Sequence, residues 1–230
     1  MKIRYGPFVG ALSGSEGNTT ASRNRSGPYL RVRSIPTKRV TPWTTEVRGR
    51  LSALSQAWGA VEASDKQAWE SWAQEHPIID RLGDSRVLQG SNAYIQLNMR
   101  LLGIGASQIS LPPVASPPAA ISGLTLTAQD GAGVCSLAWT SGALGATEQL
   151  VIWAAVLTSP GRNYYKNLLK QVFYSAAAAT SPQDFKTEIV ERFGDLLVGH
   201  RVFVHAFVYD NTTGLSSALA VANTTVVAAP

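Results

Sequence analysis

Charged side chains are scarce in this sequence: they make up 15% of its 230 residues, where about a quarter is usual. Small residues such as alanine, serine, threonine and glycine take their place. The hydrophobic fraction of 45% still allows a real core. A surface with so few charges is typical of a protein that packs against neighbours, so we expect this chain in contact with other subunits.

Cysteine is nearly absent, because Cys135 is the only one. A single cysteine excludes an intrachain disulfide and a cysteine-based zinc site. Cys135 stands in an apolar, strand-like run with Val134 and Leu137, which predicts a buried core thiol rather than a nucleophile. A chain without disulfides is typical of proteins made and assembled in the cytosol.

Long hydrophobic runs are missing as well. The longest apolar run, residues 150–157, has the length of a strand, whereas a membrane-spanning helix needs about 18 or more apolar residues. The first seven residues, MKIRYGP, lack the apolar segment of a signal peptide. We therefore expect neither a membrane span nor a membrane partner.

Catalytic patterns are also absent. Of the three histidines, His200 and His205 lie five residues apart in one predicted strand and so point to opposite faces. His76 precedes Pro77 at a predicted helix end, where a cation is favoured by the helix dipole. No HExxH, GxSxG or P-loop pattern occurs. These observations predict a non-enzymatic chain with no catalytic residues, no metal and no cofactor.

Positive charge, in contrast, is concentrated at one end. Residues 1–50 hold ten basic and two acidic side chains, a balance of +8, while residues 51–230 hold ten and thirteen, a balance of −3. Acidic patches on a shell protein or sister subunit, nucleic-acid phosphates, or solvent alone could each face this segment. The candidate partner-binding residues are Arg23, Arg25, Arg31, Arg33, Lys38 and Arg39.

The segment 1–40 is expected to be an extended basic arm, because glycines and prolines interrupt it throughout. Within it, residues 29–35 alternate between apolar and basic side chains, which predicts a strand with one basic face. An isolated strand is not stable. It needs a sheet edge from its own chain or from a neighbour, and a strand added to a neighbour's sheet would dock the arm.

Residues 41–102 are expected to form a small three-helix unit with a hairpin. Thr41-Pro42 begins the first helix, residues 64–67 read as a capping box for the second, and Gly90-Ser91 begins the third. Two short apolar runs flank Gly83-Asp84, which indicates a hairpin. The apolar stripe expected on the first helix is Trp43, Val47, Leu51, Leu54, Trp58 and Val61, and its tryptophans join Trp69 and Trp72 in the predicted core.

The segment 103–120 carries two Pro-Pro pairs and is predicted to be a semi-rigid linker. Residues 121–230 then read as an all-β sandwich domain, with one helical insertion at 184–197. The predicted strands are 124–127, 134–139, 150–157, 169–174, 201–209 and 218–227.

In strand 201–209 one set of alternating residues is small and aliphatic, and the other set is mostly aromatic. The aliphatic set is expected to face the core, which would turn the aromatic set outward as an interface. The alternative, equally open, is that segment 158–197 folds over this row. The candidate interface aromatics are Phe203, Phe207 and Tyr209, in a row that also holds His205.

The C-terminal part resembles a fibronectin type III domain. Residues 137–140, LAWT, look like that family's second strand with its core tryptophan, and residues 199–206, GHRVFVHA, look like its sixth strand. Val202 stands where the family usually has a tyrosine, and segment 158–197 is longer than usual. The resemblance implies an immunoglobulin- or fibronectin III-like sandwich and no particular function.

The N-terminal half resembles small proteins encoded among the virion genes of tailed bacteriophages. The resemblance rests on residues 13–17 (SGSEG), the Arg- and Pro-rich arm, residues 54–58 (LSQAW), 68–73 (AWESWA), 80–83 (DRLG) and 90–94 (GSNAY).

Together these features predict an α+β protein of several parts and a structural role. We expect a homo-oligomeric virion protein, such as a capsid decoration, connector or tail component, assembled in the host cytoplasm with other virion or shell proteins as partners. Two alternatives stay open. One is a nucleic-acid-binding module that uses the arm, and the other is a carbohydrate-binding or adhesion sandwich that uses the aromatic row.

Overall fold

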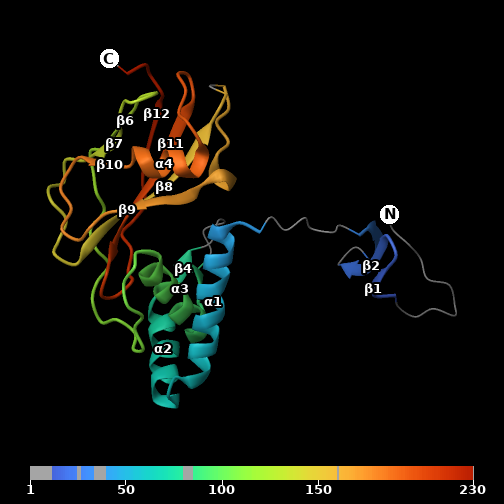
Figure 1. The fold of residues 1–230 in the computed structure, drawn as a ribbon. Coiled ribbons are helices and arrows are strands. Elements are labelled where there is room, and N and C mark those ends of the chain that lie inside the picture. The colour runs from blue at the N-terminus through green and yellow to red at the C-terminus, as the bar shows by residue number, and fades with distance from the viewer. Residues whose placement is uncertain (1–11, 25–26, 34–39, 80–84, 160, 230) are drawn as a thin grey trace. The chain divides into compact units, whose positions relative to one another are not determined.

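The computed structural model describes residues 12–24, 27–33, 40–79, 85–159 and 161–229. The chain divides into two compact units, residues 1–46 and residues 47–230. The described residues form a mixed α+β protein with antiparallel sheets, as the labelled elements of Figure 1 show.

The N-terminal unit holds a three-stranded antiparallel sheet in the order β1-β2-β3. Its strands are β1 (Gly14–Glu16), β2 (Thr19–Asn24) and β3 (Gly27–Val32). Gly17 has a φ of +54°, a conformation that glycine tolerates, and it makes the tight β1–β2 turn. The strand predicted from residue 29 is confirmed as far as Val32, and its partner is the chain's own β2.

The first helix, α1 (Pro42–Ala60), begins where the sequence predicts. The Thr44 amide donates to the Thr41 hydroxyl over 3.3 Å, which caps the helix. The predicted apolar stripe is buried only in part, because Leu54 is 1% exposed whereas Val47 and Leu51 are 51% and 45% exposed. Trp43, also 43% exposed, is therefore not part of the core, contrary to the prediction.

Helices α2 (Ala63–Glu75) and α3 (Gly90–Gly103) complete the helical part. Their core contains Leu54, Trp69, Tyr94 and Leu97. The predicted capping box does not form, because α2 begins at Ala63 with Glu62 as its N-cap residue and without a side-chain cap. The Lys66 amide already donates to the Glu62 carbonyl, so Ser64 lies inside the first turn.

The predicted hairpin around Gly83-Asp84 is confirmed by the pairing of β4 (Ile78–Ile79) with β5 (Ser85–Arg86), although residues 80–84 are outside the described residues. The start of the predicted linker is packed structure rather than a free spacer. The buried Asn98 side chain accepts from the Ile109 amide and donates to the Ile109 carbonyl, and the Trp69 indole donates to the Ser110 carbonyl over 2.7 Å.

The C-terminal part contains two antiparallel sheets, and the six predicted strands and the predicted helix are all confirmed. The three-stranded sheet has the order β10-β7-β6 and the four-stranded sheet the order β12-β11-β8-β9. Their elements are β6 (Thr125–Ala128), β7 (Cys135–Ala138), β8 (Glu148–Leu157), β9 (Lys170–Tyr174), β10 (Gln183–Asp184), α4 (Lys186–Phe193), β11 (Arg201–Asp210) and β12 (Ala220–Thr225). A short 3-10 helix, η1 (Lys166–Leu168), precedes β9.

One hydrophobic core joins the two sheets, which makes the arrangement sandwich-like. Leu137 of β7, Ile152 of β8 and Val204 of β11 are fully buried in it. Ile189 of α4 and Phe185, which directly precedes α4, are fully buried in the same core. The expected alternation of side chains in β11 is therefore confirmed. The aliphatic set faces this core, namely Val202, Val204, Ala206 and Val208.

The helical part and the sandwich lie against each other within residues 47–230 (Figure 1). The Arg100 guanidinium donates to the Gly214 carbonyl over 3.4 Å, and the side-chain amide of Gln171 donates from its Nε2 to the Gly103 carbonyl over 3.1 Å. Leu215, in the loop after β11, is buried in the helical core. Residues 103–120 therefore connect two packed layers.

Candidate functional site

The basic arm is partly described. Arg23, Arg31 and Arg33 are exposed, whereas Arg25, Lys38 and Arg39 lie outside the described residues. Arg31 pairs across the sheet with Thr20, and the Arg33 amide continues the ladder by donating to the Asn18 carbonyl over 2.8 Å. Since side chains two residues apart share a face, Arg31 and Arg33 lie on one face of the sheet and Arg23 on the other.

The face of this sheet that holds Arg23 also carries its apolar side chains. Ala21 stands opposite Leu30, and Thr19 stands opposite Val32, which is 72% exposed. A hollow of about 680 Å³ lies here, lined by residues 12–16, Thr19, Ala21 and Leu30. Among the described residues, no side chain before Leu54 belongs to any of the three hydrophobic cores.

The aromatic row of β11 is covered by the chain itself. Phe203 and Tyr209 are 4% and 8% exposed and Phe207 is partly buried, so of the two open alternatives the structure favours a covered row over an open interface. The row does face away from the sandwich core, as expected. Tyr165, from the long segment 158–197, stacks on Phe203, while Ile104 packs with Tyr209 at the other end. The predicted alternative, a cover by segment 158–197, is thus observed over Phe203.

Each of the three histidines makes contacts within the fold, and His200 Nδ1 accepts a hydrogen bond from the Leu197 amide over 3.3 Å. The His76 ring stacks on Trp72 with centroids 4.2 Å apart, and its Nδ1 lies 2.8 Å from the Trp72 carbonyl. His205 Nε2 lies 3.1 Å from the Tyr165 hydroxyl. Burial and the nearby Lys166 charge hold the pKa of His205 below its usual range. Within the described residues, no three His, Cys, Asp or Glu side chains group closely enough to hold a metal ion.

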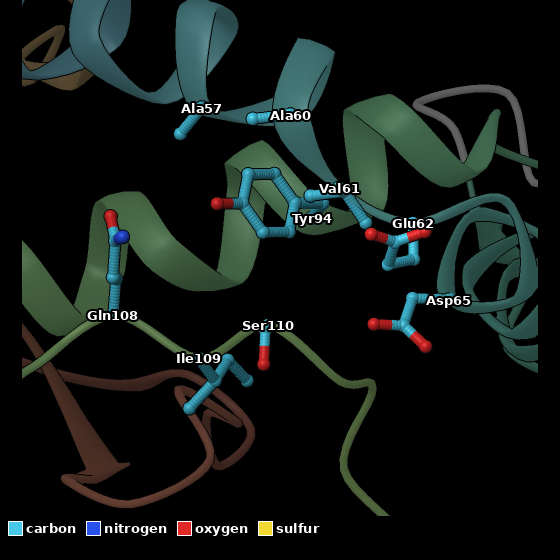
Figure 2. Close-up of a pocket in the computed structure, with 9 residues that line it drawn as sticks. All are labelled: Ala57, Ala60, Val61, Glu62, Asp65, Tyr94, Gln108, Ile109 and Ser110. Atoms are coloured by element: carbon cyan, nitrogen blue, oxygen red, sulfur yellow. The ribbon is translucent and has the colours of Figure 1, made fainter.

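A pocket of about 490 Å³ lies among the three helices and the segment after α3 (Figure 2). Ala57 and Ala60 of α1 and Val61 form part of its wall, and Ile109 adds a further apolar side chain from the segment after α3. Its polar residues are Glu62, Asp65, Tyr94, Gln108 and Ser110.

Tyr94 places its hydroxyl at one end of this pocket. The residue is 2% exposed, and its ring packs 5.3 Å from Trp58 and 5.6 Å from Trp69, centroid to centroid. Figure 2 shows the hydroxyl pointing past the ring toward the space between Ala57 and Gln108. Burial raises the pKa of Tyr94, so the hydroxyl stays protonated.

Glu62 and Asp65 lie at the other end of the pocket (Figure 2). They are the N-cap residue and a first-turn residue of α2, where carboxylates are favoured by the helix dipole. Within the described part of the chain, neither carboxylate makes an ion pair, and Asp65 accepts a 3.4 Å hydrogen bond from Ser64. The neighbouring Lys66 donates to the Gly59 carbonyl and lies over Trp58. The pocket therefore keeps an acidic end.

Sequence reasoning missed this pocket. The sequence alone places residues 108–110 in a predicted linker and indicates no functional role for Tyr94. The spacing of Glu62 and Asp65 was a visible signal, because residues three apart are neighbours on a helix surface. The position of the segment 108–110 beside them is set by the Asn98–Ile109 and Trp69–Ser110 hydrogen bonds, which no local pattern indicates.

Comparisons with known proteins give little further information. No family model matches the chain, and no curated protein matches it. One solved structure, described as the structure of T. fusca AA10A, is 10% identical and has a TM-score of 0.28. The match covers 47% of this chain and about half, 55%, of that chain. A similarity at this level carries no argument about fold or function.

Proposed function

We propose that this chain is a non-enzymatic structural or assembly protein of a bacteriophage-like virion, which docks its N-terminal sheet on neighbouring subunits. The observation that carries the proposal is that this sheet is small and packs on no hydrophobic core among the described residues. It has three short strands and none of its described side chains belongs to a hydrophobic core. A small sheet needs an apolar face packed on something to be stable.

Both faces of the sheet support a docked state. One face presents Ala21, Leu30 and the exposed Val32 beside a hollow, and the other presents Arg31 and Arg33. In addition, β3 is an edge strand of the sheet as described, and an edge strand can pair with a strand of another chain. An apolar face, a basic face and an edge together match a protein surface better than a phosphate backbone.

The sandwich supports the finer fold that we propose, an immunoglobulin- or fibronectin III-like domain. A three-stranded and a four-stranded antiparallel sheet enclose one core, and Trp139 is buried at 4% exposure. Its indole donates to the Gly142 carbonyl over 2.7 Å. We propose that this domain is a rigid body that carries the helical part. Carbohydrate binding is a weaker alternative, because the aromatic side chains of β11 are covered and offer no open face on which a sugar ring could stack.

The test is the mass of the full chain in solution as a function of concentration. We expect the wild-type protein to self-associate. The triple change Arg23→Glu, Arg31→Glu and Arg33→Glu should shift the midpoint of association to concentrations at least about tenfold higher, which corresponds to about 1.4 kcal/mol. The matched control, Arg48→Glu, Arg86→Glu and Arg162→Glu, changes the same charge at three other exposed arginines and should associate as the wild type does.

A wild-type chain that stays monomeric at all concentrations would overturn the proposal. The nucleic-acid alternative is distinguished in the same samples with a DNA duplex. It predicts binding that weakens steeply with salt and that the triple arm variant loses. Under our proposal, duplex binding is weak, and self-association does not require DNA.

A further inference from the structure

The pocket of Figure 2 contains the hydroxyl of Tyr94, a polar group on an otherwise buried side chain that the proposed function does not involve. The Tyr94 hydroxyl makes no hydrogen bond with any described residue, although Tyr94 is 2% exposed and the hydroxyl points into the pocket. The hydroxyl of a largely buried tyrosine usually has a hydrogen-bond partner, either a protein group or water. A group that enters the pocket from outside would supply one.

The rest of the pocket defines the chemistry of that group. Two carboxylates without ion pairs among the described residues lie at one end, and the side-chain oxygens of Tyr94, Gln108 and Ser110 are further acceptors. The wall between them includes Ala57, Ala60, Val61 and Ile109. Acceptors at the ends and an apolar wall fit a cation on an aliphatic stem, such as the side chain of arginine.

We propose that this pocket receives Arg31 and Arg33 from the N-terminal sheet of a second copy of this chain. The proposal rests on the proposed function and names the surface on which the arm docks. Both arginines are exposed, share one face of an edge strand and make no ion pair among the described residues. Side chains two residues apart in a strand emerge about 6.7 Å from each other, so the pair can reach separate acceptors in one elongated pocket.

Charge complementarity favours this occupant over a different partner. Residues 1–50 carry a balance of +8 and residues 51–230 a balance of −3, so one copy supplies the basic strand and the next supplies the acidic pocket. Such a contact is heterologous, because the two surfaces differ. Repetition of a heterologous contact produces a closed ring or an open filament, which agrees with a role in assembly.

The experiment uses two full-length variants and their mixture. The pocket variant is Glu62→Arg with Asp65→Arg, and the arm variant is Arg31→Glu with Arg33→Glu. Each variant alone should remain monomeric at concentrations where the wild type associates. In an equimolar mixture, the intact arm of the pocket variant can enter the intact pocket of the arm variant. The mixture should therefore form a complex that stops at two chains, measured by sedimentation.

Tyr94→Phe is the third variant, because it removes only the hydroxyl. We expect it to weaken self-association by about tenfold, as for a lost hydrogen bond to a charged group, with an unchanged unfolding midpoint. The matched control is Glu188→Arg with Glu191→Arg, two acidic residues of α4 away from the pocket, which should associate as the wild type does. If the pocket variant fails to fold, Tyr94→Phe still decides the role of the pocket.

The outcomes separate this inference from the proposed function. If the arm variant is monomeric while the pocket variant and Tyr94→Phe associate as the wild type does, the pocket is not the docking surface and the assembly role stands. If each variant is monomeric and their equimolar mixture also stays monomeric, the two copies do not pair through these groups and the inference is wrong. If the wild type never associates, the inference and the proposed function fail together.

Discussion

The ring of Tyr165 lies nearly parallel to the ring of Phe203, with 4.1 Å between ring centroids and 12° between ring planes. Tyr165 belongs to the segment between β8 and β9, and Phe203 is on β11. The same tyrosine places its hydroxyl 3.1 Å from His205 Nε2. One side chain therefore covers two members of the outward row of β11 and holds a long connection against the sheet.

Replacing this cover should destabilise the sandwich. Tyr165→Ala removes the stacked ring, and we expect the free energy of unfolding to fall by about 2 kcal/mol in chemical denaturation. Tyr165→Phe keeps the stack and should lose about 1 kcal/mol with the hydroxyl contact. The adjacent Tyr164 is 60% exposed, so Tyr164→Ala is the control and should change stability by less than about 0.5 kcal/mol. Equal effects of the two alanine variants would contradict this role of Tyr165.

The stability of the protein should depend on pH through His205. Burial, with a further contribution from Lys166, lowers the pKa of His205 in the folded chain. Below about pH 6.5 the unfolded chain binds a proton that the folded chain does not yet bind, so stability falls as the pH falls through this range. In His205→Gln this part of the pH dependence should vanish. Unfolding curves recorded between about pH 8 and pH 5 measure this pH dependence. Parallel profiles of stability against pH for the wild type and His205→Gln would rule out the role of His205.

The thiol of Cys135 should be unreactive in the folded chain. The residue is fully buried, and desolvation raises its pKa to about 12, so almost no thiolate is present near neutral pH. We expect alkylation by iodoacetamide at neutral pH to be slow in the folded chain and fast in denaturant. Above about pH 8.5 the unfolded chain loses this proton first, so stability should fall with rising pH. Labelling of the folded protein at the denatured rate would contradict the assignment.

The contact between helices and sandwich should be sensitive at Gly214. This residue has a φ of +71°, and a Cβ there would meet the Leu97 carbonyl oxygen at 2.6 Å. Gly214→Ala should therefore lower stability by about 3 kcal/mol, from backbone strain and from the displaced helix. Gly142 has a φ of +87° with no atom within 4 Å of the added carbon. As the matched control, Gly142→Ala should lose only the strain, about 1 kcal/mol, and a similar loss at both sites in thermal unfolding would contradict the close approach.

Local patterns were sufficient for most elements. The period of two in residues 201–209 predicted both the strand and its core-facing residues, because each alternating side chain in a strand faces one side. The Thr41-Pro42 start was likewise correct, since capping depends on a few neighbouring residues. Local patterns could not predict whether the aromatic row of β11 is buried. Whether Phe203 is open or covered depends on where Tyr165, 38 residues earlier, is placed by the fold.

The apolar stripe of α1 shows the same limit. Its spacing is that of a helix face along its whole length, yet Leu54 is buried while Val47 and Leu51 are about half exposed. Periodicity defines which side chains share a face. It does not say how far along the helix a neighbouring element extends. The part of α1 that is covered depends on where α2 and α3 pack against it.

The sequence by itself determined the mixed α+β class, most strand positions and the concentration of positive charge in the first fifty residues, because these depend on short-range spacing and composition. Only the tertiary structure decided the candidate site. The pocket combines α1, the start of α2, Tyr94 of α3 and the segment 108–110, and the buried hydrogen bonds of Asn98 and Trp69 hold that segment in place. Such contacts join residues far apart in the chain, so the acceptors that surround the Tyr94 hydroxyl come together only when the helices pack.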